Sequence, residues 1–284
     1  MNKISLLILV ILVMACNNSS DYVLSDENPP INKERKAQII SAFFGLDNSL
    51  PLISAGLWKE APGQDGMPLV FSHEIDPNTL DAHDFLITTA NGEKMQVDFV
   101  TLKPASEAFE LRTVLLIGEY GNAPENEPVE VEIIGELQSR DGQEMQGQKI
   151  EVTPLSDGPF ISYAEHFVID EVYPYNNEKK GCDCPKDETT TIVRTVWAGG
   201  VVATNGEELG IDQLENFTIT LRRDKTSIKV KPFLIADLND NDNNIDLCIK
   251  EKGTPIRVEV DEHIVIDPNQ DKNPKTSSEI VSRW

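Results

Sequence analysis

Apolar and polar residues alternate in short runs along most of this chain, and this pattern predicts β-strands. Val129, Val131 and Ile133 alternate with Glu130 and Glu132, so this run has one apolar face and one charged face. The stretch from Val114 to Ile117 is continuously apolar, as expected for a strand that is buried on both faces. The two patterns together favour a sheet with a dry side and a wet side.

Turn signals separate the strands expected between Leu52 and Leu155. Asn91-Gly92 is a strong hairpin signal between two β-prone runs, and Asp141-Gly142 predicts another turn. The remaining strands are expected at residues 67–72, 85–89, 97–99 and 150–152. About seven short strands with this punctuation indicate a β-sandwich.

The second half of the chain is expected to be rich in strands too. Ser156-Asp157-Gly158-Pro159 is a candidate domain boundary, and strands are predicted at residues 161–169, 192–197, 217–221, 228–230 and 256–260. The fold class is therefore all-β, with two β-rich domains at residues 46–157 and 158–284.

The amino terminus has a different pattern. Lys3 precedes twelve uncharged residues, Ile4 to Ala15, and a bilayer-spanning helix needs about 20. A basic start followed by a short apolar run is typical of an export signal. Val13-Met14-Ala15-Cys16 resembles the lipobox of bacterial lipoproteins. That resemblance implies a signal peptide at residues 1–15, cleavage before Cys16 and attachment of lipid to its sulfur. An ordinary signal peptide is the alternative.

Residues 16–45 are expected to connect this anchor to the first domain. Asn17 to Asn32 is polar and contains Pro29-Pro30, so it is expected to be a flexible tether. Lys33 to Phe44 is expected to form a short helix that ends at Gly45.

The first domain also carries a family resemblance. Phe71-Ser72 is followed by Ile75-Asp76-Pro77-Asn78-Thr79-Leu80 and then by Phe85, Ile87 and Gly92. This series is similar to the opening of the bacterial Ig-like domains of surface proteins. The resemblance covers about a quarter of the domain and implies a spacer or binding module without a shared catalytic apparatus.

The charge of the chain narrows the class of partner. The sequence has 25 basic and 48 acidic residues, a net charge of −23. Such a field repels polyanions and attracts cations. We therefore expect no nucleic-acid partner; a protein or glycan ligand is possible, and the membrane is expected to be reached through the lipid.

An acidic run near residue 240 is the candidate metal site. Ca²⁺ prefers six to eight oxygen ligands, and closely spaced Asp and Asn side chains can supply several. The start of the run resembles the calcium-binding linker of cadherin repeats, although the Pro that usually follows is absent. A solvated turn rich in Asx residues is the alternative, and possible calcium is the one candidate cofactor. The candidate ligands are Asp237, Asn239, Asp240, Asn241, Asp242 and Asp246.

Three cysteines follow Cys16. We expect a disulfide from Cys248 to either Cys182 or Cys184, which leaves one thiol free. The spacing of Cys182 and Cys184 differs from that of thiol oxidoreductases, and a second pair of zinc ligands is missing from the sequence pattern.

These features together predict a lipid-anchored protein of the bacterial cell envelope, at the periplasmic face or the cell surface. We expect a non-catalytic binding or structural module, because no motif nominates catalytic residues. The alternatives are an envelope hydrolase with a site assembled from sequence-distant residues, and a calcium-dependent adhesion element.

Overall fold

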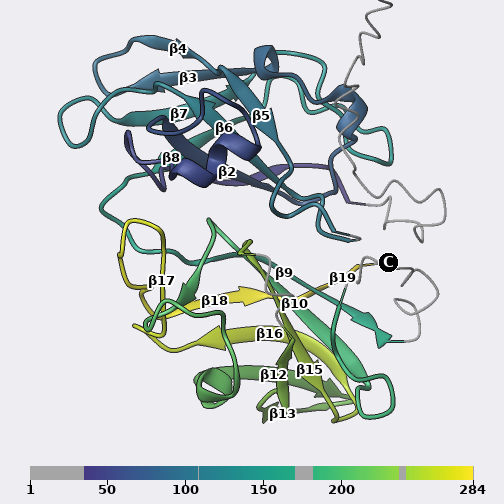
Figure 1. The fold of residues 1–284 in the computed structure, drawn as a ribbon. Helices are drawn as coiled ribbons and strands as arrows, with labels where there is room; N and C mark the ends of the chain where they lie inside the picture. The colour runs from purple at the N-terminus through teal and green to yellow at the C-terminus, as the bar shows by residue number, and fades with distance from the viewer. Residues whose placement is uncertain (1–34, 108, 170–181, 237–240, 284) are drawn as a thin grey trace, which may run out of the picture.

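The computed structural model describes residues 35–107, 109–169, 182–236 and 241–283. Across these residues the chain is built almost entirely from strands joined by turns and short 3₁₀ helices, which confirms the all-β prediction. In the described part of the chain, no helix has the length and apolarity to cross a membrane. Figure 1 shows the strands in two groups, β1–β8 above and β9–β19 below.

The first group, which we call the N-terminal half, is one sheet folded over on itself. Its strand order is β4-β3-β7-β8-β1-β2-β6-β5, and the pair β1–β8 is parallel. Its strands are β1 Ile39–Phe43, β2 Asp65–Phe71, β3 Phe85–Thr89, β4 Lys94–Gln96, β5 Phe99–Thr101, β6 Thr113–Gly118, β7 Pro128–Ile133 and β8 Lys149–Thr153. The short helices are η1 Leu52–Gly56, η2 Pro77–Thr79 and η3 Ala82–Asp84.

The apolar core of this half lies between two runs of the sheet. Phe71 of β2 and Leu116 of β6 come from one run, and Phe85 of β3 and Val131 of β7 come from the other. When β1 to β8 are lettered A, B, C, C′, D, E, F and G in chain order, the two runs of the sheet read A-B-E-D and C′-C-F-G. This is the strand order of immunoglobulin-type sheets. The likeness to bacterial Ig-like domains stays a prediction.

Two turn predictions in this half are confirmed. Gly92 closes the hairpin between β3 and β4 with a φ of 87°, a conformation that glycine adopts without steric cost. Gly142 has a φ of 82° and donates its N–H to the carbonyl of Ser139.

The apolar run at residues 114–117 lies in β6, where only Leu115 is partly exposed.

The helix expected at Lys33 to Phe44 is wrong where the structure describes it. Residues Ile39–Phe43 form β1, which lies between β2 and β8. Both faces of β1 are covered: Ala42 lies in the core, and Ser41 donates a 2.7 Å hydrogen bond to Ser162 of the other half. A strand buried on both faces loses its alternation, so the sequence pattern did not distinguish it from a helix. The range 16–45 therefore includes one strand of the N-terminal sheet.

The second group, which we call the C-terminal half, is a sandwich. A five-stranded sheet, β14-β15-β10-β9-β19, packs on a four-stranded sheet, β13-β12-β16-β18, with the pair β11–β17 beside them. The strands are β9 Ile161–Val168, β10 Thr191–Trp197, β11 Val202–Ala203, β12 Phe217–Arg223, β13 Thr226–Val230, β14 Leu234–Ala236, β15 Asn244–Ile249, β16 Thr254–Val260, β17 Val265–Ile266, β18 Thr276–Glu279 and β19 Val281–Ser282, and one 3₁₀ helix is η5 Ile211–Asn216.

The five-stranded sheet is buried on both faces. Every residue of β10 and β15 is buried. On one face Val193 and Leu247 join the sandwich core, and on the other Val196 packs against Val70 of the N-terminal half. This sheet is therefore a middle layer between the C-terminal core and the N-terminal half. No named strand of one half pairs with a strand of the other, but the shared buried surface joins them.

Candidate functional site at the junction of the halves

The predicted site residues separate into different roles. Cys16, Asp237, Asn239 and Asp240 lie outside the described residues. The Cys184–Cys248 disulfide confirms one of the two expected pairings, with 5.7 Å between the Cα atoms, and Cys182 is a buried free thiol. Burial raises the pKa of Cys182 well above its usual value, so the thiol form is favoured.

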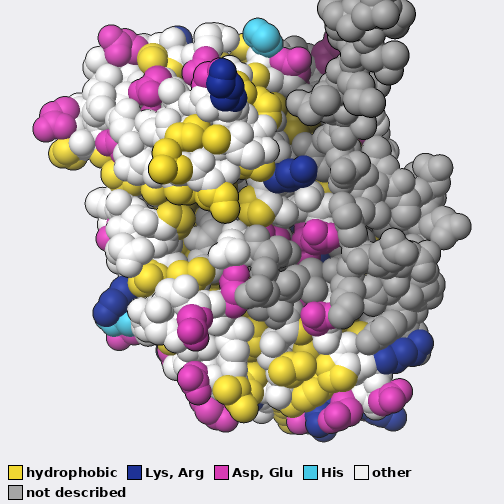
Figure 2. Space-filling view, in the orientation of Figure 1, with side chains coloured by type: hydrophobic (Ala, Val, Ile, Leu, Met, Phe, Trp, Pro, Cys, Tyr) yellow, Lys and Arg dark blue, Asp and Glu magenta, His cyan; other side chains and the backbone are white. Residues whose placement is uncertain are grey.

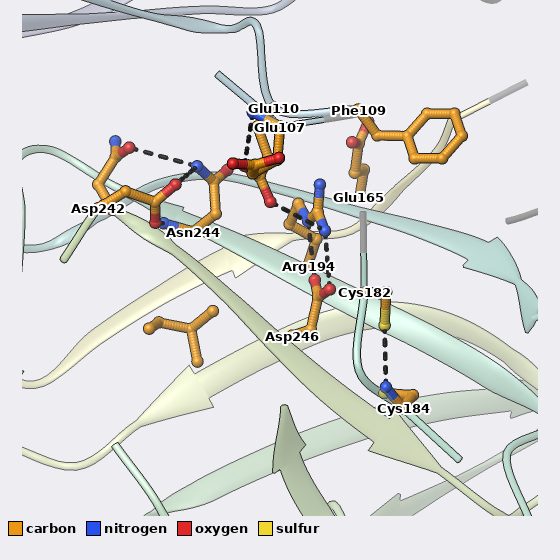
Figure 3. Close-up of polar contacts among 12 residues, drawn as sticks. Glu107, Phe109, Glu110, Glu165, Cys182, Cys184, Arg194, Asp242, Asn244 and Asp246 are labelled. Atoms are coloured by element: carbon orange, nitrogen blue, oxygen red, sulfur yellow. Dashed lines mark hydrogen bonds and ion pairs between the residues drawn. The ribbon is translucent and has the colours of Figure 1, made fainter. Parts of the chain in front are cut away.

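The described members of the acidic run do not converge on one point. The N–H of Asn241 donates to Glu208 at 3.1 Å. The carboxylate of Asp242 accepts hydrogen bonds from the backbone and side-chain nitrogens of Asn244, at 2.6 and 2.9 Å. Asp246 lies within β15 and binds Arg194 (Figure 3). Among the residues described, no group of three or more His, Cys, Asp or Glu side chains is arranged to hold a metal ion. Calcium stays a prediction.

A buried network of charged side chains lies where the two halves meet, and the sequence analysis did not find it. Glu165, on β9, is the centre of the network. Its carboxylate binds Arg112 of the N-terminal half at 2.6 Å and also binds Arg283 near the chain end. Arg283 then reaches Glu74 at 2.7 Å, and Arg140 contacts the other oxygen of Glu74 at 3.3 Å. Glu165 is therefore paired with arginines from both halves.

A second branch of the network lies beside the first. Arg194 of β10 binds Asp246 through two hydrogen bonds of 2.7 Å, one from Nε and one from Nη2. The same Nη2 lies 3.4 Å from Glu110 of the N-terminal half. Figure 3 shows Arg194 between Asp246, from the sheet below it, and Glu110, from the loop above it. Such a fork-shaped pair fixes the position of both partners as well as their distance.

Aromatic rings complete the surroundings of the arginines. The guanidinium of Arg283 lies 4.7 Å from the ring centre of Phe109, and that of Arg112 lies 4.9 Å from the ring centre of Tyr163. Side-chain exposure is 3% or less for the seven inner members, Glu74, Glu110, Arg112, Glu165, Arg194, Asp246 and Arg283. We call these seven residues the junction network.

The electrostatics of the network keep Glu165 and Glu74 ionised. Burial alone raises the pKa of Glu165, but Arg112, Arg283 and Arg194 outweigh it and lower the pKa to about 2. The pKa of Glu74 is also lowered, because Arg283, Arg140 and Arg112 outweigh the effect of burial. Removing one partner would therefore leave an uncompensated charge in a dry interface, which is strongly destabilising.

A Ser–His contact close to this network is closed to solvent. Ser72 Oγ lies 2.9 Å from His73 Nδ1, but the exposed fraction is 8% for Ser72 and 0% for His73. Burial also lowers the pKa of His73. The pair lies in the packed interior, where Ser72 Oγ also accepts a hydrogen bond of 2.8 Å from the backbone N–H of Gln38.

A cavity of about 570 Å³ also lies at the junction. Its wall combines Phe43, Leu50 and Leu102 of the N-terminal half with Gly199 and Asn243 of the C-terminal half. Half of the lining residues are aliphatic or proline, and four more are glycines. The junction thus contains a charged network that joins the halves and an apolar space between them.

The sequence carries a signal for two residues of the junction network, because each is a charged residue inside an apolar run. Arg194 is flanked by Ile192-Val193 on one side and Val196-Trp197 on the other, and Glu165 follows Tyr163-Ala164 in an apolar run. A charged residue inside a buried strand requires a partner. The partners Arg112, Glu110 and Glu74 lie more than 50 residues away in sequence, so the pairing itself carries no local signal.

Comparisons with known proteins give no family. No family model matches the chain, and the search of curated proteins finds no match. Among solved structures, the chain is similar to the N-terminal part of the bacterial S-layer protein SbsC, with a TM-score of 0.30, 10% identity, and coverage of 87% of this chain and 44% of that one.

Two further structures of the same S-layer protein show the same level of likeness. The structure of residues 31–844 gives a TM-score of 0.30 at 10% identity, covering 87% of this chain and 41% of that one. The structure of domains 1–6 gives a TM-score of 0.29 at 13% identity, covering 84% of this chain and 33% of that one. This chain spans less than half the length of each. At these scores the likeness defines neither a shared fold nor a shared function.

Proposed function

We propose that this protein is a lipid-anchored module of the bacterial cell envelope that acts by holding its two β-rich halves in one fixed arrangement. It is a structural or binding module, and its activity is presentation of a rigid surface. The observation that supports this most is the junction network, because Glu165 binds Arg112 of one half and Arg283 of the other. A hinged or mobile pair of domains would not place seven charged side chains in a dry interface.

The apolar contacts of the junction also support a fixed arrangement of the two halves. Val70 packs against Tyr163 and Val196, and Gly199 allows Phe43 to approach closely, since a Cβ at this glycine would lie 3.1 Å from the Phe43 ring. Interfaces between domains of one chain are usually polar and permit motion unless they are large and apolar. Here apolar packing surrounds ion pairs that cross between the halves, such as Arg112–Glu165 and Arg283–Glu74. The rigidity is tested by a distance between the halves: one spin label on each should report a single narrow distribution that broadens in Glu165→Gln.

The envelope location is supported by the sequence of the amino terminus, which carries a short apolar run and Cys16. We expect the Cys16→Ser protein to leave the membrane fraction and to lose acylation, because the serine hydroxyl does not replace the cysteine thiol as the lipid acceptor. The measurement is membrane fractionation together with metabolic labelling by a fatty acid. Cys182→Ala is the matched control, since it removes a buried thiol that lies 166 positions after Cys16 in the sequence. Unchanged fractionation of Cys16→Ser would contradict the anchoring.

A further inference from the structure

The cavity between the halves has the size and composition of a ligand site. Its volume of about 570 Å³ falls within the usual range of small-molecule pockets, which is about 300–1,000 Å³. One wall comes from the N-terminal half, with Leu46, Leu50 and Leu102, and the opposite wall comes from Gly199 and Gly200. Because the junction network holds these walls in place, the cavity is formed before any ligand arrives.

The chemistry of the wall selects an aliphatic ligand. Among the described lining residues, Phe43 is the single aromatic one, beside leucines, prolines and an isoleucine. Two of these described residues are charged, Lys103 and Asp242. The carboxylate of Asp242 accepts two hydrogen bonds from Asn244. Lys103 is thus the basic group of the described lining, and it is suited to an anionic group at the end of an apolar ligand.

The cavity reaches the surface beside η1. Ile53 lines the cavity and is 85% exposed, and its neighbour Leu52 is 86% exposed. Figure 2 shows hydrophobic side chains at the surface over η1 and toward the junction. Exposed aliphatic side chains at the entrance to an apolar cavity gain free energy when a ligand covers them, at about 25 cal/mol per Å².

We propose that this cavity binds one aliphatic chain that ends in an anionic group such as a carboxylate. The chain lies between the leucines of the N-terminal half and the glycines at residues 199 and 200. The anionic end lies at Lys103, and Leu52 and Ile53 cover the part nearest the surface. This inference rests on the fixed junction of the proposed function, which holds the two walls of the cavity, and it does not depend on the lipid anchor.

Gly200 provides the most direct variant. A Cβ at this position meets nothing closer than 3.7 Å, and its φ is not in the left-handed region, so a larger side chain is compatible with the fold. Leucine at this position occupies cavity volume. Gly200→Leu should therefore block the ligand and leave the melting temperature within a few degrees of the parent protein.

The experiment is a fluorescence titration of the full-length Cys16→Ser protein with cis-parinaric acid, followed by displacement with dodecanoate, dodecanol and dodecyltrimethylammonium. We expect saturable one-to-one binding that Gly200→Leu weakens at least tenfold. Lys103→Gln should weaken displacement by dodecanoate and leave that by dodecanol unchanged. Binding without a fixed stoichiometry, or binding that Gly200→Leu leaves unchanged, would overturn the proposal.

A matched pair of surface variants separates the cavity from general hydrophobic adsorption. Ile53→Ser removes an aliphatic side chain at the entrance, and Ile211→Ser removes one that is 81% exposed on η5 in the C-terminal half. We expect only Ile53→Ser to weaken binding. Equal effects of the two variants would show adsorption to exposed side chains. Displacement by dodecyltrimethylammonium as strong as by dodecanoate would overturn the assignment of an anionic end.

Discussion

Glu165 shows how a buried charge joins two parts of one chain. Its carboxylate is fully buried, yet its pKa is about 2 because burial is outweighed by Arg112, Arg283 and Arg194. Replacing a buried ion pair with apolar residues can be neutral, but removing one partner of an existing pair costs about 3–5 kcal/mol. The junction network therefore fixes the arrangement of the halves even where its net contribution to stability is small.

Stability should depend on pH through this residue. The folded-state pKa of Glu165 is lowered from 4.5 to about 2, so its stabilising contribution is present above pH 4.5 and is lost as the pH falls toward 2. Glu165→Gln should lower the free energy of unfolding by about 3–5 kcal/mol at pH 7. The difference between the two proteins should shrink between pH 5 and pH 3, measured by urea unfolding.

Glu130→Gln is the control for this change. Glu130 pairs with Lys149 at 3.1 Å on the surface of the N-terminal half, with both side chains more than a third exposed. Exposed pairs contribute about 0–1 kcal/mol. The control should therefore unfold nearly as the parent protein does at every pH. A constant difference for Glu165→Gln across this pH range would show that the carboxylate is not held ionised by its partners.

At the scale of elements, the sheet β14-β15-β10-β9-β19 determines the architecture. It supplies one face to the C-terminal core and the other to the junction, where Cys248, Asp246 and Arg194 lie. The disulfide fastens the segment that contains Cys184 to β15 of this sheet. The segment that contains Cys184 is thereby joined covalently to the sheet that forms the middle layer of the molecule.

Reduction of this disulfide should be measurable. It joins residues that are 64 positions apart, and closing a loop of this length typically stabilises a protein by about 2–4 kcal/mol. We expect the double variant Cys184→Ala, Cys248→Ala to melt about 5–15 °C lower than the parent, measured by circular dichroism. A reductant should lower the melting temperature of the parent and leave that of the double variant unchanged.

Cys182→Ala distinguishes the disulfide from the free thiol. Cys182 is buried in the same apolar cluster as the disulfide, but it makes no covalent bond. This variant should keep its sensitivity to reductant. Loss of that sensitivity in Cys182→Ala would show that the disulfide forms through Cys182 instead.

The elements that were predicted from sequence share a clear one-sided or fully apolar pattern. The sequence alternates strictly at residues 129–133 and 217–221, and each strand has one face in a core, although Val129 at the start of the first is exposed. β1 was missed because neither of its faces is exposed to solvent. One face lies in the core, and the other contacts Ser162 of the C-terminal half and lines the cavity through Phe43. Local pattern identifies a strand that has a wet face, and it is ambiguous for a short strand without one.

At the scale of the whole molecule, the net charge of −23 contrasts with the interior of the junction, where acids are paired with arginines. An excess of acids on this scale disfavours contact with polyanions, whereas the junction network pairs its acids with arginines. The excess of acids can be read directly from the composition. The pairing depends on contacts between residues that are 50 to 210 positions apart, such as Arg283 and Glu74, and only the folded chain brings them together.

We expect the two halves to form one rigid body. This expectation is tested most directly by pulsed electron paramagnetic resonance on the Cys16→Ser, Cys182→Ala protein with spin labels at Gln96→Cys and Ser227→Cys. Both positions are exposed, one on β4 and one on β13, at opposite ends of the molecule in Figure 1. The parent protein should give a single narrow distance distribution that Glu130→Gln preserves and Glu165→Gln broadens. A broad distribution in the parent protein, or an unchanged narrow one in Glu165→Gln, would contradict this expectation.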